Sequence, residues 1–179
     1  MILPIVKAPN AVLKTKAKKV LRFDDKLQKL LIDMSETLVA TTDPEGVGLA
    51  ANQVGVSKRI FIIRPNKKSE IREFINPEII KFKKDKIKNK KELKDKTTLE
   101  GCLSLEKIWA PVYRPSSVLV AYQTKDGTHH EEWFTGFHSI IIQHEMDHLN
   151  GILFTLRALE QGAPVYEEVG EEYREIKLS

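Results

Sequence analysis

His144-Glu145-Met146-Asp147-His148 carries the strongest functional pattern in this 179-residue chain. Residues four positions apart lie on the same face of a helix, so the two imidazoles can bind one metal ion. The glutamate between them then lies next to any water that the metal holds. Such a segment combines a Lewis acid, a nucleophile and a proton carrier. It therefore predicts a metal-dependent hydrolytic site.

The surrounding residues predict the helix that carries this pattern. Gly136 opens it and Asn150-Gly151 ends it, because glycine and asparagine tolerate the left-handed conformation common at helix ends. One broad face of this helix contains Phe137, Ile140, Ile141, His144 and His148. We expect the apolar first two turns to pack in the core and the last two turns to bind the metal.

The remaining pattern predicts strands around this helix. An earlier helix is expected from Asp24 or Asp25 to about Ala40, where leucines recur at helical spacing. Strands are expected at 59–64, at 73–80 with a kink at Pro77, and in a hairpin of 117–122 and 128–134 around Asp126-Gly127. Residues 1–179 thus predict a single α+β domain. Mixed or antiparallel strands pack around the central metal-binding helix in this fold.

Two histidines leave the predicted site one ligand short, because a catalytic site of this kind uses three protein ligands and one open position. The candidates are Cys102, Asp147, Glu131, Glu132, His129, His130 and His138. His138 points away from the face of the other two, and His129 and His130 are expected as exposed hairpin residues. Asp147 points off that face and is expected to orient a histidine or a backbone group. Cys102 would complete a chemically sound Cys-His-His set as a thiolate, although spacing alone does not single it out.

The charge of the chain is unevenly distributed. The net charge is +4, with lysines concentrated from Lys81 to Lys96 and acidic residues from Glu160 to Glu175. The lysine segment is expected to be a solvated loop or edge hairpin. A contact with a polyanion such as ribosomal RNA is the alternative. Phe82 is its only aromatic residue, so the segment lacks surfaces on which bases stack.

Composition indicates a globular cytoplasmic protein. Hydrophobic residues make up 41% of the chain and charged residues 30%, which is usual for such a protein. No apolar run reaches the length of a membrane span, and the apolar start from Met1 to Val6 is too short for a signal peptide. The single cysteine excludes a disulfide within the chain. We therefore expect no membrane partner.

Three separate segments resemble the signature motifs of the peptide deformylase family, in the same order. GVGLAANQ at residues 46–53 resembles G-x-G-L-A-A-x-Q, EGCLS at 100–104 resembles E-G-C-L-S, and QHEMDH at 143–148 resembles Q-H-E-x-D-H. The early helix, the strand order and the length also resemble a bacterial-type deformylase. Together these matches are far more specific than any one motif.

The resemblance implies a metal site and its support. The implied metal ligands are Cys102, His144 and His148. The metal in this family is typically Fe²⁺, and Zn²⁺, Ni²⁺ or Co²⁺ can replace it. Glu100 would pair with Arg114 and brace the segment that carries the cysteine.

The resemblance also implies the reaction, which removes the N-formyl group from the formylmethionine of nascent polypeptides and releases formate. Metal-bound hydroxide would attack the formyl carbon, with Glu145 as general base and then general acid. Gln53 and the backbone N–H of Leu103 would stabilise the oxyanion. Gly48 would lie where the substrate backbone passes.

An apolar pocket for the methionine side chain is expected beside the metal. The residues expected to line it are Val47, Phe137, Ile140 and Ile141. The alternative for each of them is a role only in the core. Gly48 and Glu100 complete the expected substrate-binding set.

One stretch departs from the family pattern. Glu106 stands where the family usually has proline, and residues 106–110 are atypical as a whole. Many bacterial members have a basic residue at the position of Trp109, where it contacts the substrate backbone. The outer rim of the substrate groove is therefore expected to differ here. Pro164 and Gly170 interrupt the C-terminal tail, to which no role is assigned.

Two other functions compete with this interpretation. A zinc endopeptidase would use the same helix but usually takes a third His, Glu or Asp downstream, and no histidine follows His148. A non-catalytic protein that binds RNA or the ribosome through the lysine segment would use its metal for structure alone. A structural site is normally closed by four protein ligands, whereas only three good candidates exist here.

Overall fold

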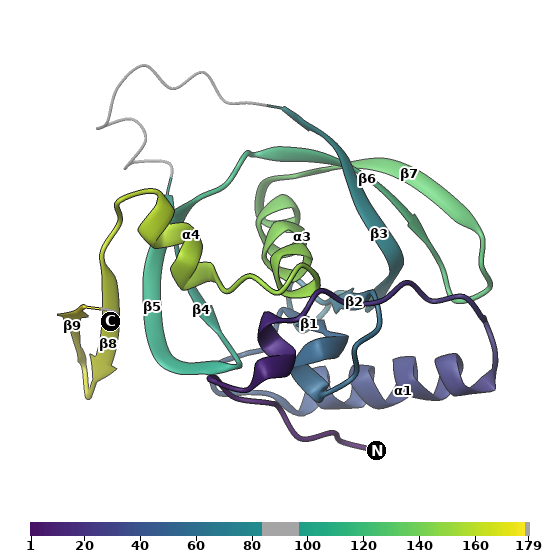
Figure 1. The fold of residues 1–179 in the computed structure, drawn as a ribbon, viewed down its shortest axis with the longest axis horizontal. Coiled ribbons are helices and arrows are strands. Elements are labelled where there is room, and N and C mark those ends of the chain that lie inside the picture. Colours follow the sequence, from purple (N-terminus) through teal and green to yellow (C-terminus); the bar gives the residue numbers. More distant parts are fainter. Residues whose placement is uncertain (84–96, 178–179) are drawn as a thin grey trace.

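The protein folds as a single α+β domain, shown by a computed structural model that describes residues 1–83 and 97–177. Within these ranges there are two antiparallel sheets and three α-helices (Figure 1). The helices are α1 (Asp25–Ala40), α3 (Gly136–Leu149) and α4 (Phe154–Glu160), with short 3₁₀ helices η1 (Ala11–Lys14) and η2 (Ala51–Val54). This architecture confirms the fold class expected from the sequence.

The larger sheet contains five strands in the order β1-β2-β3-β6-β7. Their bounds are β1 (Gly48–Ala50), β2 (Ile60–Ile63), β3 (Arg72–Lys83), β6 (Ser117–Gln123) and β7 (His129–Thr135). The β6–β7 hairpin forms around Asp126-Gly127, as predicted. β3 pairs with β6 through a register shift between Ile75 and Glu78, which gives the irregularity expected near Pro77.

The apolar run of β2 is explained by burial on both faces of this sheet. Phe61 and Ile63 belong to a core cluster with α3, whereas Ile60 and Ile62 belong to a cluster with α1. Alternate residues of a strand point to opposite faces, so every residue of β2 contacts one helix layer or the other. A fully buried strand therefore has no polar position.

Helix α1 begins where the sequence predicts. The Asp24 side chain accepts a hydrogen bond from the Leu27 N–H at 3.1 Å, which satisfies one of the unpaired donors of the first turn. Leu27, Leu31 and Leu38 are buried against the sheet. This local signal was sufficient to place the helix.

Helix α3 corrects one expectation from the sequence. Its first turn, with Phe137 and His138, is exposed, whereas every residue from Ile141 to Leu149 is buried. The reason is that the later turns pack against the five-stranded sheet and extend between it and the smaller sheet (Figure 1). The histidine-bearing end is thus the most enclosed part of the helix.

The smaller sheet contains four strands in the order β4-β5-β8-β9. Their bounds are β4 (Thr97–Cys102), β5 (Leu105–Tyr113), β8 (Val165–Val169) and β9 (Glu172–Ile176). Helix α4 packs on this sheet through a cluster that includes Ala110, Phe154 and Ala158. The C-terminal tail, for which no structure was predicted, is therefore a hairpin that extends the sheet beyond β5.

Most of the lysine segment lies outside the described residues. Only Lys81, Phe82 and Lys83 are described, and they form the exposed end of β3. In the described ranges, no helix combines the length and apolar character needed to cross a bilayer.

Candidate metal centre and active site

Three side chains from two elements meet between the sheets. Cys102 ends β4, and His144 and His148 lie on α3, with one ligand atom from each within 4.8 Å of the others. The Cys102 Sγ–His148 Nε2 distance is 3.2 Å. A tetrahedral ion with ordinary metal–sulfur and metal–nitrogen bonds separates such atoms by about 3.5 Å. The donor types and their spacing therefore fit a divalent metal ion.

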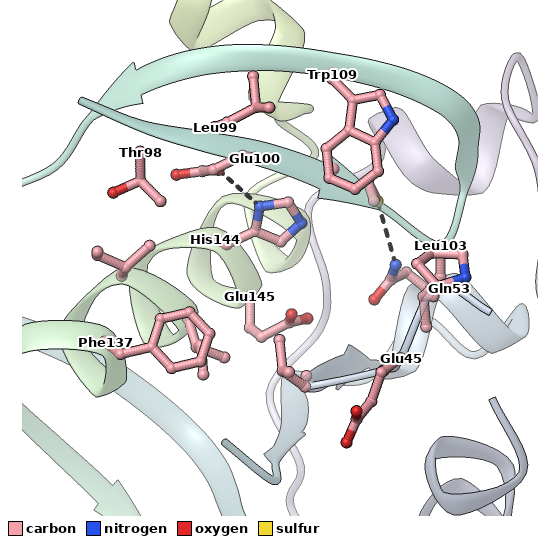
Figure 2. A pocket seen from close by; sticks show the side chains of 18 residues that line it. Glu45, Gln53, Thr98, Leu99, Glu100, Leu103, Trp109, Phe137, His144 and Glu145 are labelled. Atoms are coloured by element: carbon pink, nitrogen blue, oxygen red, sulfur yellow. Dashed lines mark hydrogen bonds and ion pairs between the residues drawn. The ribbon is translucent and has the colours of Figure 1, made fainter. Parts of the chain in front are cut away.

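One hydrogen bond orients the His144 ring, and another holds the backbone of α3 at His148. The Nδ1 atom of His144 lies 2.9 Å from Glu100 Oε2, so its Nε2 atom is directed away from Glu100 (Figure 2). The Asn52 side chain donates to the His148 carbonyl at 2.5 Å. In the described part of the chain, the buried Nδ1 atom of His148 has no hydrogen-bond partner. Glu100 thus orients the His144 ring, whereas the His148 ring is placed by its backbone and by the contact of its Nε2 atom with Cys102.

The electrostatic environment favours a charged cluster. Burial alone would raise the pKa of Cys102, but the adjacent imidazoles of His148 and His144 outweigh it and hold the pKa well below its usual value. Burial would likewise raise the pKa of Glu100, but His144 and Arg114 lower it to about 2. A thiolate is the form in which cysteine binds metals.

Buried Arg114 and partly buried Arg157 support the cluster from behind. Arg114 binds both carboxylate oxygens of Glu100, at 2.5 and 2.9 Å, as the family resemblance implied. It also donates to Asp147 at 2.9 Å, and Arg157 binds the same carboxylate at 2.7 Å. Asp147 was expected to orient a histidine or a backbone group. Its carboxylate instead pairs with Arg114 and Arg157, and Arg114 in turn binds Glu100, the partner of His144.

Glu145 lies beside the cluster and is almost completely buried, with 3% of its surface exposed. Its Oε2 atom has no hydrogen-bond partner among the described residues. Burial raises the pKa of Glu145 to about 7. A carboxyl group with such a pKa can take up and release a proton near neutral pH.

Gly48 is packed directly against Glu145. A Cβ atom at this position would lie 2.4 Å from Glu145 Oε1 and 2.9 Å from Ile141 Cγ2. Any larger residue would therefore displace the glutamate. The sequence analysis placed Gly48 beside the substrate backbone, and the structure adds this second requirement for glycine.

The Gln53 amide is oriented by its own turn. Its Oε1 accepts from the Ala50 N–H at 2.9 Å, which directs its Nε2 toward Cys102 Sγ at 3.5 Å and Ser104 Oγ at 3.3 Å. Leu103 follows Cys102, and its carbonyl accepts from Lys7 Nζ at 2.7 Å. Gln53 therefore presents a fixed donor beside the sulfur (Figure 2).

A cavity of about 230 Å³ opens next to these residues. Val47, Phe137, Ile140 and Ile141 line it together with Gly48, Glu100 and Leu103. Ile141 is also part of the core, whereas Phe137 is 48% exposed at the cavity rim. Ile141 thus has both of the roles that were considered as alternatives: it lines the pocket and it packs in the core.

The other candidate ligands do not join the cluster. His129, His130, His138 and Glu131 are exposed. Glu132 lies on β7, where it pairs with Arg72 and Tyr122. Within 1–83 and 97–177, only Cys102 joins His144 and His148 in a group of this kind.

Sequence reasoning missed several supporting residues. Ser104 and Asn52 lie inside the quoted motifs, beside Cys102 and Gln53, so their position in those motifs was a usable signal. Arg157 had no comparable signal, because its link to Asp147 depends on where α4 packs. Trp109 was expected only as an altered residue of the outer rim of the groove, and its ring lines the cavity.

The fold and this site together define a class of enzyme: a metal-dependent hydrolase whose cysteine and two histidines come from a strand and a helix. The polypeptide deformylase family profile matches residues 2–163. The chain therefore belongs to the peptide deformylase family, whose members are hydrolases that deformylate nascent peptides.

Individual relatives agree with this assignment. A peptide deformylase of Zymomonas mobilis is 41% identical over 160 residues, covering 86% of this chain and 84% of the relative. A crystal structure of a peptide deformylase from Legionella pneumophila has a TM-score of 0.76 at 36% identity, covering 88% of this chain and 86% of that one. A peptide deformylase from Acinetobacter baumannii, solved with Met-Ala-Ser bound, has a TM-score of 0.75 at 35% identity, covering 88% and 98%.

Proposed function

We propose that residues 1–179 act as one catalytic domain that hydrolyses the N-formyl group of formylmethionyl peptides, with Glu145 as the proton-transferring group. One observation carries this proposal. Glu145 lines the cavity, is buried beside the Cys102, His144 and His148 cluster, and has an Oε2 atom without a hydrogen-bond partner among the described residues. A buried carboxyl group without a partner is costly, and a water or substrate at this position would satisfy it.

The metal site is proposed to consist of Cys102, His144 and His148. The ion is Fe²⁺, with Zn²⁺, Ni²⁺ or Co²⁺ as substitutes, because a soft thiolate and two imidazoles suit each of these metals. When bound, the metal supplies a Lewis acid that lowers the pKa of water near neutrality. The chain contributes the rigid placement of its three donors through Glu100, Arg114 and Asn52.

The remaining residues act on the formyl group and on protons. Gln53 Nε2 and the backbone N–H of Leu103 donate to the carbonyl oxygen as it becomes negative. Glu145 removes a proton from the attacking water and delivers it to the nitrogen of the leaving methionine. The products are formate and a free amino terminus. The preset orientation of Gln53 supports this role, because no rearrangement is needed when charge develops.

The substrate is proposed to lie between two strand edges. β1 and β4 end their respective sheets in the described residues, and both line the cavity. An extended peptide pairs with such edges through its backbone. The methionine side chain then enters the apolar region of Val47, Ile140 and Ile141. The complex of the Acinetobacter baumannii relative with Met-Ala-Ser supports a short peptide ligand that begins with methionine.

Formate release tests the proposed reaction. Protein loaded with Fe²⁺ or Ni²⁺ without oxygen is expected to release formate from formyl-Met-Ala-Ser and not from acetyl-Met-Ala-Ser. The same protein should leave internal peptide bonds of a denatured protein uncut, which separates it from a zinc endopeptidase. Absence of formate from fully loaded protein contradicts the proposal.

Metal content tests the ligand set. Cys102→Ser is expected to lower metal affinity by more than about 100-fold, because loss of a ligand exceeds the effect of losing an outer hydrogen bond. The measurement is a competition with a chelator of known affinity. His138→Ser, on the exposed first turn of α3, is the control. An unchanged affinity of Cys102→Ser removes the thiolate from the site.

The substrate arises at the ribosome, so we infer a cytoplasmic location and a transient contact with the ribosome. Lysines from 81 to 96 are the proposed contact, although most of this segment lies outside the described residues. Binding through lysine and phosphate is expected to weaken steeply as salt rises. A co-sedimentation experiment with ribosomes at increasing salt measures it, and absent or salt-independent binding contradicts the contact.

A further inference from the structure

We propose that the C-terminal hairpin β8–β9 is a substrate-recognition element that holds Trp109 as an aromatic wall of the groove. An apolar or aromatic side chain that follows the methionine packs on this wall. The inference rests on the proposed function, because it assigns a contact to the same peptide. Trp109 contacts the substrate, whereas Glu168 and Tyr173 are positioning residues that act through it.

Trp109 lies at the cavity on the side opposite Phe137. Figure 2 shows its ring extending from β5 toward Gln53 and Leu103. Phe137 lies on the other side of His144 and Glu145. The ring crosses the neighbouring strand at Gly101, where a Cβ atom would lie 2.7 Å from the indole. The indole therefore covers the backbone of the strand that ends at Cys102. This position places its exposed surface beside a bound peptide.

Two residues of the hairpin hold this ring. The Trp109 Nε1–H donates to Glu168 Oε2 at 2.7 Å. The Tyr173 ring meets the indole edge-on, with a centroid distance of 6.2 Å and an interplanar angle of 85°. Glu168 and Tyr173 are paired across β8 and β9, so they reach the indole together. An indole N–H can only donate, and a carboxylate is its strongest acceptor.

The hairpin lies beyond the segment that defines the family. The family match ends at residue 163, whereas the hairpin begins at Val165. Trp109 itself belongs to the atypical stretch 106–110. One hydrogen bond thus joins the atypical stretch 106–110 to a hairpin that lies outside the matched segment. The groove of this chain gains a rigid apolar surface from that pairing.

Peptides of two kinds test the wall. Wild-type protein is expected to have a higher kcat/KM for formyl-Met-Phe-Phe than for formyl-Met-Ala-Ala. Trp109→Ala should reduce this preference about tenfold, at the lower end of what one apolar contact contributes to discrimination. The loss should appear in KM rather than in kcat, because the wall contacts the side chain that follows the methionine and not the reacting formyl group. An unchanged preference in Trp109→Ala overturns the proposal.

Variants of the hairpin test the positioning. Glu168→Leu is expected to lose most of the preference, whereas Glu168→Gln keeps an oxygen acceptor and should retain more of it. Tyr173→Phe keeps the ring and is the matched control for Tyr173→Leu. Equal preferences in Glu168→Leu and wild type overturn the role of the hairpin.

Fluorescence tests the contact without turnover. The chain has two tryptophans, and Trp133 lies on β7 with 46% exposure, so Trp133→Phe leaves Trp109 as the single reporter. Titration with the product peptide Met-Phe-Phe should change the emission of Trp109, and Met-Ala-Ala should change it less. Equal responses overturn the inference. Loss of formate release from every peptide would instead contradict the proposed function, while this titration still reports on the wall.

Discussion

The two walls of the cavity are held in different ways. On the α3 wall, Glu145, Gly48 and Ile141 are buried and in contact, so a change at one position is transmitted to the others. On the β4–β5 wall, Leu99 is 46% exposed and Trp109 depends on a few contacts from a distant hairpin. Glu100 and Cys102 of β4 are buried as well, so on this wall only the rim formed by Leu99 and Trp109 can change without disturbing the reacting groups.

The largest expected effect is on the packed wall, at its acid–base group. Glu145→Gln should keep the shape of the side chain but lower kcat/KM about 1,000-fold, because an amide cannot carry the proton. Metal content should remain that of the wild type. Glu131→Gln, at an exposed glutamate of β7, is the control. Near-normal turnover in Glu145→Gln would show that another group moves the proton.

The buried ion pairs behind the metal site should dominate the stability of this region. Arg114→Met leaves the buried carboxylates of Glu100 and Asp147 without their shared partner, and we expect a loss of about 3 kcal/mol in unfolding free energy. Denaturant unfolding of metal-loaded protein measures it. Arg174→Met removes an exposed pair with Glu172 and should have little effect. Similar losses of unfolding free energy in both variants would mean that the contribution of an ion pair to stability does not depend on its burial.

A smaller effect is expected from one added methyl group on the same wall. Gly48→Ala should push Glu145 out of place and lower kcat/KM about 100-fold, as a misplacement near 1 Å does. In a Glu145→Gln background the same substitution should lower kcat/KM much less, because the side chain that it displaces can no longer transfer a proton. Additive losses of kcat/KM in the double variant would show that Gly48→Ala does not act through the displacement of Glu145.

The smallest effect is expected on the open wall. Glu106 replaces the usual proline of the family and forms an exposed ion pair with Lys7 at 2.6 Å. Exposed pairs contribute little, so Glu106→Gln should change kcat/KM by less than about twofold. Steady-state kinetics with formyl-Met-Ala-Ser measures it. A loss comparable to that of Gly48→Ala would show that the two walls are equally constrained.

Local signals predicted much of the fold. Asp24 capped the expected helix, Asp126-Gly127 placed the β6–β7 hairpin, and Asn150 ended α3, because each depends on neighbours within a few residues. The C-terminal hairpin was not predicted, since its first strand, β8, is stabilised by pairing with β5 across a long stretch of chain.

The candidate site could be predicted only in part for the same reason. The helical spacing of His144 and His148 is local, whereas Cys102 was one of several candidate ligands and was singled out only by the family resemblance. The exposure of the first turn of α3 and the contact of Arg157 with Asp147 depend on tertiary packing. Sequence periodicity carries no information about either.

The placement of the three proposed ligands links metal occupancy to the association of the two sheets. Cys102 belongs to the four-stranded sheet, and the two histidines belong to the helix on the five-stranded sheet. An ion held by all three is a cross-link between the two halves, and its binding free energy adds to the cohesion between them. Removal of the metal by a chelator should therefore speed amide hydrogen exchange in β4 and β5 more than in β2.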